Sequence, residues 1–270
     1  MTQLKKEATA IDKADPVAVA SARAVDYLKK QVDAKKPNGE VIRALVVAGA
    51  KGYNVGSTLD PALPFLKAAA QWPKADRIAL GHALAAAERH GRAASTDLTA
   101  AAKLLTAEQQ QDGSYGSILD TWRARHTLIE SGMQPDDVWV ILIDRWVRGV
   151  SQIDTTREVA AALLALDHSS DVMADNLRRS SLSYLRNAQS KDGGWGPKGD
   201  KPTVADTALA ILALSVLDAE PRLARSTYRP EELKEAIALG KRFLASAQRP
   251  DGSWAEGGST PWALLALLGP

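Results

Sequence analysis

Two kinds of apolar pattern alternate along the chain, and each predicts a different kind of helix. The segment PEELKEAIALGKRFLASAQ (230–248) has apolar residues on one helical face and charged residues on the other, which is typical of a helix with one side in water. Segments such as TALAILALSVL (207–217) and AAALLAL (160–166) are apolar nearly all round, which indicates burial on most sides. The sequence therefore predicts an all-helical protein in which half-exposed and buried helices alternate.

A glycine-containing turn separates the two kinds of helix three times. The segments LLTAEQQQDGSYG (104–116), YLRNAQSKDGGWG (184–196) and FLASAQRPDGSW (243–254) share a Leu, a Gln, an Asp-Gly pair and an aromatic residue at the same spacing. Self-similarity of this kind indicates a repeat architecture. Because the turn recurs, we interpret it as a structural clasp on the outside of the fold. Its recurring side chains are Gln109, Tyr115, Gln189, Trp195, Gln248 and Trp254.

Three further copies of the helix pair lack this turn. They lie in residues 21–50, 64–91 and 136–167, and the first of them matches least well. An acidic residue marks the start of the buried helix in five copies, and Ser259 or Thr260 takes its place in the sixth. These acidic markers are Glu40, Asp76, Asp120, Asp154 and Asp206.

Six pairs of an outer and an inner helix predict a closed ring, an (α/α)6 toroid. We expect residues 17–270 to form this single domain and residues 1–16 to form a loose arm. An open solenoid is the alternative, but its terminal repeats need a polar capping face. The last helix, PWALLALLG, is apolar up to the chain end and so needs a partner, which closure onto the first repeat would provide.

The repeated motif resembles that of a known family. The pattern Leu-x-x-x-Gln-x-x-Asp-Gly-x-Trp, followed by Asp-Thr-Ala and an Ala- and Leu-rich helix, is similar to the QW-type repeat of terpenoid cyclases and to the related repeat of protein prenyltransferase β subunits. The resemblance covers residues 17–270 at the level of repeats. It implies a toroid whose central cavity binds an isoprenoid or another amphiphile with an anionic head.

The catalytic groups that the resemblance implies are largely missing. Squalene-hopene-type cyclases use the middle aspartate of Asp-x-Asp-Asp-Thr-Ala as an acid, whereas the matching segment TVADTA keeps only Asp206, with Thr203 and Ala205 in place of the other two aspartates. The zinc-binding Cys of prenyltransferases and the reactive Cys of thioester domains with this fold have no counterpart, because the chain has no cysteine. Whether the protein is an enzyme therefore stays open.

Composition and charge exclude several other classes. The formal net charge is +2, and no basic run is interleaved with aromatic residues, so we expect no nucleic-acid partner. No apolar run reaches membrane-spanning length. His90 and His168 stand at helix ends without paired ligands, and we expect neither a metal site nor a cofactor. The N-terminus lacks the apolar core of a signal peptide, which indicates a cytoplasmic protein as written, or an exported one if Met1 replaces a removed signal peptide.

Polar residues recur at matched positions of the inner helices. Three arginines lie three residues after the acidic marker, and two histidines lie six residues after it, so they could share one helix face. If that face lines the lumen, arginine offers a planar set of donors for a carboxylate or diphosphate. The predicted ligand-binding residues, including two inner-helix aromatics, are Arg43, Arg123, Arg157, Trp122 and Trp262. The candidate catalytic residues are Asp206, Asp120, Asp154, His126 and His82.

Structural roles compete with these assignments. An Asp at a helix start can cap the helix, an Arg three residues later can pair with it, and a lone His on an apolar helix is commonly a hydrogen-bonded core residue. Two other functions are also open: a non-catalytic interaction scaffold whose lumen is filled by its own side chains, and a polysaccharide-lyase-like enzyme that acts on an acidic sugar polymer.

Overall fold

The protein is helical throughout the part of the chain that the structure describes. The computed structural model describes residues 15–134, 155–166, 172–197, 200–219, 229–255 and 258–269. In these ranges the one β feature is an isolated bridge between Trp195 and Thr203. The predicted all-helical class is thus confirmed. Of the predicted arm, only Asp15 and Pro16 lie within the described residues, and the Asp15 carboxylate caps helix α2 (Pro16–Lys29) by accepting the backbone N–H of Val17.

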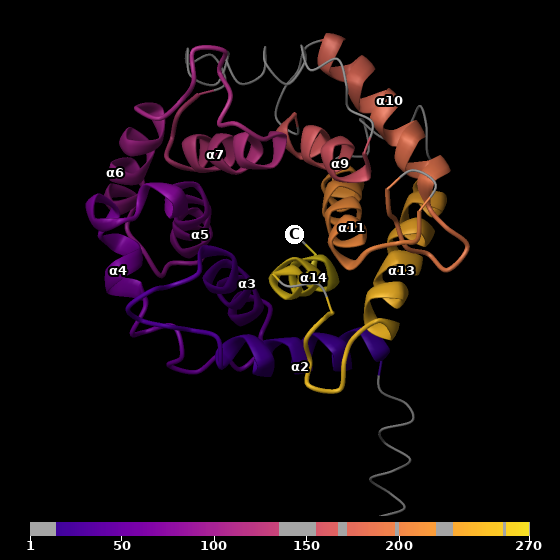
Figure 1. Ribbon diagram of the computed structural model, residues 1–270, viewed down its shortest axis with the longest axis horizontal. Coiled ribbons are helices and arrows are strands. Elements are labelled where there is room, and N and C mark those ends of the chain that lie inside the picture. Colours follow the sequence, from indigo (N-terminus) through magenta and orange to yellow (C-terminus); the bar gives the residue numbers. More distant parts are fainter. Residues whose placement is uncertain are drawn as a thin grey trace, which may run out of the picture.

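The helices form an inner and an outer set (Figure 1). The inner set comprises α3 (Gly39–Ala50), α5 (Arg77–Arg89), α7 (Ile118–Glu130), α9 (Thr156–Ala165), α11 (Val204–Ala219) and α14 (Ser259–Leu268). The outer set comprises α2 (Pro16–Lys29), α4 (Leu63–Lys67), α6 (Ser95–Thr106), α10 (Val172–Ala188) and α13 (Pro230–Ser246). Each inner helix packs against the next inner helix along the chain, and α14 packs against α3. The end of the chain therefore contacts helices near its beginning.

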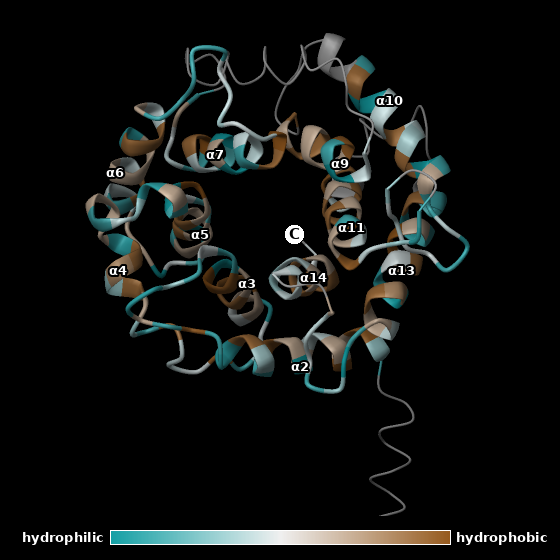
Figure 2. Cartoon of the chain, viewed as in Figure 1, coloured by the Kyte–Doolittle hydropathy of each residue, from teal (hydrophilic) through white to brown (hydrophobic). Residues whose placement is uncertain are grey.

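Burial follows the two apolar patterns of the sequence. Every residue of α14 from Ser259 to Leu267 is buried, whereas α2 buries a single stripe that includes Ala24 and Leu28. Many of the hydrophilic residues lie on the outer helices and the connecting loops (Figure 2). The core therefore occupies the layer between the two sets of helices and the sides of the inner helices.

One expected outer helix is broken. The segment that follows the loop after α3 forms only the short α4, a 3-10 turn η1 (Ala69–Gln71) and a second 3-10 turn η2 (Lys74–Asp76) before α5 begins. Pro73 disfavours a helical conformation at Trp72, and Trp72 is extended. The Trp72 indole N–H donates to the carbonyl oxygen of Phe65 at 3.0 Å, which folds the segment back on itself.

The recurring turn has the same internal hydrogen bonds in all three copies. In the last copy the Gln248 amide donates to the carbonyl oxygen of Gly252 at 3.0 Å, and the Trp254 indole N–H donates to that of Leu244 at 2.8 Å. Gln189 and Trp195 make the equivalent bonds, as do Gln109 and, through its hydroxyl, Tyr115. The backbone N–H of each aromatic residue donates to a threonine hydroxyl of the following inner helix. These threonines are Thr121, Thr207 and Thr260.

Two of the turns also join neighbouring repeats. Gln189 donates a second bond to the carbonyl oxygen of Ala236 on α13, and Gln248 donates one at 2.8 Å to that of Ala20 on α2. The Asp-Gly glycines lie in the left-handed region, and a β-carbon on Gly252 would lie 2.3 Å from the carbonyl oxygen of Arg23. Only glycine permits both this backbone shape and this close approach. The turn that ends the repeat series is thus bonded to the first outer helix.

Two of the acidic markers, Asp120 and Asp206, are not the residues whose side chains cap their helices. Ser117 caps α7 by accepting the backbone N–H of Asp120, and the Thr203 hydroxyl accepts the backbone N–H of Asp206 in the same way. Each Asp lies three residues after its Ser or Thr, and its carboxylate accepts a hydrogen bond from the hydroxyl of that Ser or Thr. This Ser/Thr-x-x-acid arrangement resembles a capping box, so the interpretation of Asp120 and Asp206 as N-caps is corrected. Asp154 lies outside the described residues.

None of the helices among the described residues is both long and apolar enough to cross a lipid bilayer.

Candidate ligand-binding cavity

A cavity opens inside the ring where the inner helices end. Its volume is about 360 Å³, within the range of about 300–1,000 Å³ that is common for small-molecule sites. We call it the C-side cavity. Its lining residues are Arg43, Val47, Lys51, Arg89, His90, Trp122, His126, Leu164, Leu212, Val216, Leu265 and Gly269. The charged groups in this lining are cationic, and most of the other side chains are apolar.

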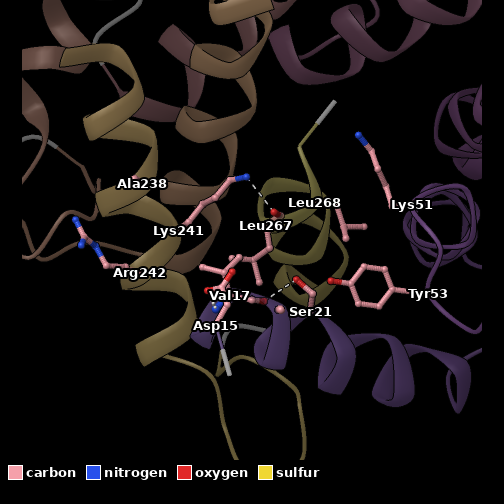
Figure 3. Close-up of a pocket in the computed structure, with 11 residues that line it drawn as sticks. Asp15, Val17, Ser21, Lys51, Tyr53, Ala238, Lys241, Arg242, Leu267 and Leu268 are labelled. Carbon is pink, nitrogen blue, oxygen red and sulfur yellow. Dashed lines mark hydrogen bonds between the residues drawn. The ribbon is translucent and has the colours of Figure 1, made fainter. Parts of the chain in front are cut away.

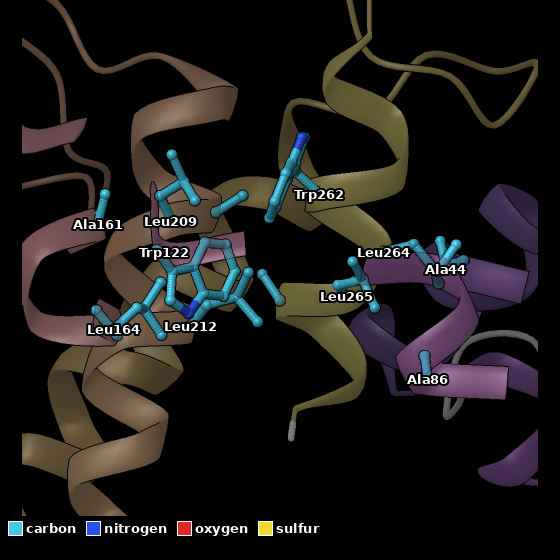
Figure 4. Close-up of a cluster of buried hydrophobic side chains, with 14 of the residues drawn as sticks. Ala44, Ala86, Trp122, Ala161, Leu164, Leu209, Leu212, Trp262, Leu264 and Leu265 are labelled. Carbon is cyan, nitrogen blue, oxygen red and sulfur yellow. The ribbon is translucent and has the colours of Figure 1, made fainter. Parts of the chain in front are cut away.

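A second cavity, the N-side cavity, lies where several inner helices begin. It measures about 340 Å³ and shares no lining residue with the C-side cavity. Trp262 lines the N-side cavity and Trp122 lines the C-side cavity, and their ring centroids are 5.9 Å apart. Both rings belong to a buried apolar cluster that includes Leu209 and Leu212 (Figure 4). The tryptophan pair therefore stands between the two cavities.

Arg43 packs against this tryptophan pair from α3. Its guanidinium carbon lies 5.7 Å from the ring centroid of Trp122 and 5.7 Å from that of Trp262, so the cation faces two aromatic rings. Burial lowers the pKa of Arg43 to about 10, and Glu40 partly offsets this shift. A pKa of about 10 still leaves the side chain positively charged at neutral pH. The inner end of the C-side cavity is therefore both cationic and aromatic.

The two predicted histidines meet beside Trp122. The ring of His82 lies 4.9 Å from that of Trp122 and 4.9 Å from that of His126, both in edge-on geometry. His82 is fully buried, and neither ring nitrogen has a hydrogen-bond partner among the described residues. Burial lowers the pKa of His82 well below 6.5, and the neighbouring Arg43 lowers it further, so the ring is neutral. Of these two histidines, only His126 lines the C-side cavity.

Arg123 is engaged by carboxylates of its own chain. It forms ion pairs of 2.8 Å with Glu40 across the helix interface and of 2.8 Å with Asp120 on its own helix, and it stacks 4.8 Å from the Trp262 ring centroid. Burial raises the pKa of Glu40, and the nearby Arg123 and Arg43 act against that rise. Arg123 thus completes a partly buried ion-pair network and does not line the C-side cavity.

Arg157 and Asp206 form a second internal pair. The Nε atom of Arg157 donates to an Asp206 carboxylate oxygen at 3.0 Å, joining α9 to α11. Arg157 lines the N-side cavity, whereas Arg43 lines the C-side cavity. The three predicted arginines therefore occupy three different environments, and only Arg43 is both inside the C-side cavity and without a paired carboxylate among the described residues.

The outer edge of the C-side cavity contains residues that were not among the binding residues predicted from the sequence. Lys51, Arg89 and His90 stand at the ends of α3 and α5 and are exposed. Arg89 pairs with Glu130, and its Nη2 atom lies 3.3 Å from Nε2 of His126. One signal was available in the sequence: inner helices that all follow outer helices in the same order end at the same face of the ring, so their last turns converge.

A third cavity of about 490 Å³ lies between α2, α13 and α14, outside the ring of inner helices. Lys241 reaches across it from α13 and donates to the carbonyl oxygen of Leu267 at 3.0 Å (Figure 3). Burial lowers the pKa of Lys241, and the lining includes Asp15 as well as cations. This cavity is larger than the C-side cavity, but its most buried cation already has a partner.

Comparison with known proteins does not assign the chain to a family: no protein-family model matches it, and no curated protein is significantly similar to it. Among the described residues, no group of three or more His, Asp or Glu side chains has an arrangement that could hold a metal ion.

Proposed function

We propose that the chain is a closed (α/α)6 toroid of the terpenoid-cyclase and prenyltransferase type, and that its C-side cavity binds an isoprenoid or another amphiphile with an anionic head. The contact between α14 and α3 and the hydrogen bond from Gln248 to Ala20 support closure of the ring. The expected sixth outer helix falls in residues 135–154, outside the described residues. The resemblance of the repeats supports the family.

The observation that carries the ligand proposal is the lining of the C-side cavity. Its walls are formed by aliphatic side chains such as Leu164, Leu212 and Val216, and its charged lining residues, Arg43, Lys51 and Arg89, are all cationic. Burying an apolar tail against such walls contributes about 25 cal/mol per Å² of apolar surface removed from water. An anionic head gains charge-assisted hydrogen bonds from whichever of these cations it meets. An amphiphile satisfies both requirements at once.

The proposal concerns binding, and catalysis would have to use groups of this cavity. Of the candidate catalytic residues that the structure describes, only His126 lines the C-side cavity. Asp206 and Asp120 are held in ion pairs with Arg157 and Arg123. These two carboxylates therefore join helices or residues of the fold, and neither lines the C-side cavity.

An interaction scaffold is the second candidate, and the internal pairing of Arg123 and Arg157 favours it. A scaffold, however, has no need of a cavity lined by an unpaired guanidinium. The two functions differ in whether a small amphiphile binds to the purified protein.

Isothermal titration calorimetry with geranyl diphosphate, geraniol and inorganic diphosphate tests the proposal. We expect geranyl diphosphate to bind at least tenfold more tightly than geraniol or inorganic diphosphate. Only the whole molecule places an apolar tail against the walls and an anionic head beside a cation. Val216→Phe should fill the C-side cavity and abolish binding, whereas Leu119→Phe, a matched change in the N-side cavity, should leave it intact. Absence of binding to the parent protein, or equal losses in the two variants, would contradict the proposal.

A further inference from the structure

The C-side cavity has cations at both ends, so the orientation of its ligand is a separate question. Arg43 and Lys51 lie on the same helix, about 12 Å apart along its axis at 1.5 Å per residue. We call the inner end, with Arg43 and Trp122, the floor, and the outer end, with Lys51, Arg89 and His90, the rim. Apolar side chains of α9, α11 and α14 line the space between them.

The cations of the rim are exposed and have other reasons to be there. Lys51, Arg89 and His90 are all exposed to solvent. Arg89 has a carboxylate partner in Glu130. Cations at the carboxyl ends of helices are also favoured by the helix dipole, without any ligand. The rim therefore needs no bound anion.

The floor, in contrast, holds donors without acceptors. Arg43 has five N–H donors and makes no hydrogen bond to any described residue, and its Nη1 atom is buried. The indole ring of Trp122 lies beside Arg43 and lines the same cavity, and its nitrogen points toward the end of the ring where α14 finishes (Figure 4). Buried donors that lack partners cost free energy, and the apolar surroundings strengthen any bond that they do form.

The carboxylate nearest to the floor belongs to another partner. Glu40 is the acidic neighbour of Arg43, but it forms its ion pair with Arg123, which also holds Asp120. The aromatic faces of Trp122 and Trp262 stabilise the Arg43 cation without accepting in-plane hydrogen bonds from its N–H groups. Arg43 therefore has a charged neighbour but forms no ion pair with a carboxylate among the described residues.

We infer that the ligand of the C-side cavity enters head first: a carboxylate or phosphate monoester binds at the floor, on Arg43 and the Trp122 indole N–H, and the apolar tail runs out along Leu164, Leu212 and Val216 to the rim. This inference rests on the proposed function and adds the orientation of the ligand. It assigns Arg43 as the residue that selects an anionic head. It also limits the tail to a chain that spans about two helical turns, the distance from Arg43 to Lys51.

Titration calorimetry with a set of ten-carbon probes tests the head group. Decanoate and decyl phosphate should bind, and decan-1-ol should bind more weakly, because the floor offers charge-assisted donors. Decyltrimethylammonium should not bind, because its charge would face Arg43. Tight binding of the cationic probe would overturn the inference, and a preference between decanoate and decyl phosphate identifies which oxyanion the floor accepts.

Two glutamine substitutions distinguish the floor from the rim. Arg43→Gln should weaken decanoate binding about ten- to hundredfold, the range expected for lost charge-assisted bonds, and leave decan-1-ol binding within about threefold. Arg43→Lys should restore part of the affinity. Lys51→Gln, the matched change at the rim, should alter decanoate binding by less than about threefold, since an exposed charge contributes little. Thermal melts of the free proteins establish that each variant is folded.

The two proposals fail in different ways. If the parent protein binds decanoate but Lys51→Gln weakens it more than Arg43→Gln does, the head lies at the rim, so the inferred orientation is wrong and the proposed function stands. If geranyl diphosphate binds to the parent protein but neither decanoate nor decyl phosphate does, the inferred head group at the floor is wrong and the proposed function stands. If none of the three binds, the amphiphile function itself is wrong and the orientation falls with it.

Discussion

The three recurring turns (104–116, 184–196 and 243–254) and the floor of the C-side cavity differ in whether their side-chain N–H donors have acceptors. In the turn around Gln248, the side-chain amide and the Trp254 indole each find a carbonyl oxygen of the chain. At the floor, the buried Nη1 atom of Arg43 finds no acceptor among the described residues. The turn recurs with the same bonds in three repeats, whereas the floor occurs once. Residues that repeat with their partners hold the ring together, and unrepeated donors without partners indicate where a ligand would bind.

Removing the aromatic ring of Trp254 from the recurring turn should have the largest effect on stability and no effect on ligand binding. Trp254→Ala should lower the free energy of unfolding by about 3–5 kcal/mol, the usual cost of truncating a buried aromatic side chain. Urea denaturation followed by circular dichroism measures it. The folded fraction should bind decanoate as the parent does. A variant that keeps its stability but loses affinity would place the turn in the binding site.

The glycine of the closing turn offers a sharper test with a matched control. Gly252→Ala combines a positive φ of 89° with a β-carbon 2.3 Å from the carbonyl oxygen of Arg23, so it should destabilise the protein by about 3 kcal/mol. Gly132→Ala has a similar φ of 96° but nothing within 4 Å, so it should cost only the backbone strain, about 1–2 kcal/mol. Equal losses in the two variants, measured by urea denaturation, would show that contact between the last turn and α2 does not close the ring.

The smallest expected effect is the pH dependence that His82 introduces. The pKa of His82 in the folded protein lies well below 6.5, so below pH 6.5 the unfolded chain binds a proton that the folded protein does not. Stability from the neutral ring is therefore fully present above pH 6.5 and is lost as the pH falls. The raised pKa of Glu40 acts in the opposite direction but is common to the parent and the variant.

His82→Leu should remove this loss. Between pH 7.5 and 5.5 the parent should lose about 1 kcal/mol more stability than the variant, since one pKa unit corresponds to about 1.4 kcal/mol. At pH 7.5 the variant should be at least as stable, because an unpartnered buried ring is replaced by an apolar side chain. Parallel stability profiles of the two proteins would mean that His82 has a partner or titrates normally.

The sequence predicts the helical class and the recurring turn, because both depend on local patterns. The partners of Gln189 and Gln248 on the next outer helix could not be predicted, since these bonds join residues 47 and 228 positions apart. The capping hydroxyls of Ser117 and Thr203 could have been found from the Ser/Thr-x-x-acid spacing.

The candidate site shows where local patterns stop being informative. Arg43, Arg123 and Arg157 have the same register in the sequence, yet their environments differ because partners come from neighbouring helices. Glu40 forms an ion pair with Arg123, and Asp206 forms one with Arg157. Arg43 is left against two aromatic rings. The register in the sequence predicts on which face of a helix a residue lies. Which carboxylate pairs with which arginine depends on how neighbouring helices pack.

The central claim is that the anionic head of the ligand lies at the floor, and a bromine label locates it most directly. In a crystal structure of the protein with 10-bromodecanoate, we expect anomalous density for bromine at the rim, near Lys51 and Gly269, with the carboxylate on Arg43. Bromine beside Trp122 at the floor, or in the N-side cavity near Trp262, would contradict it.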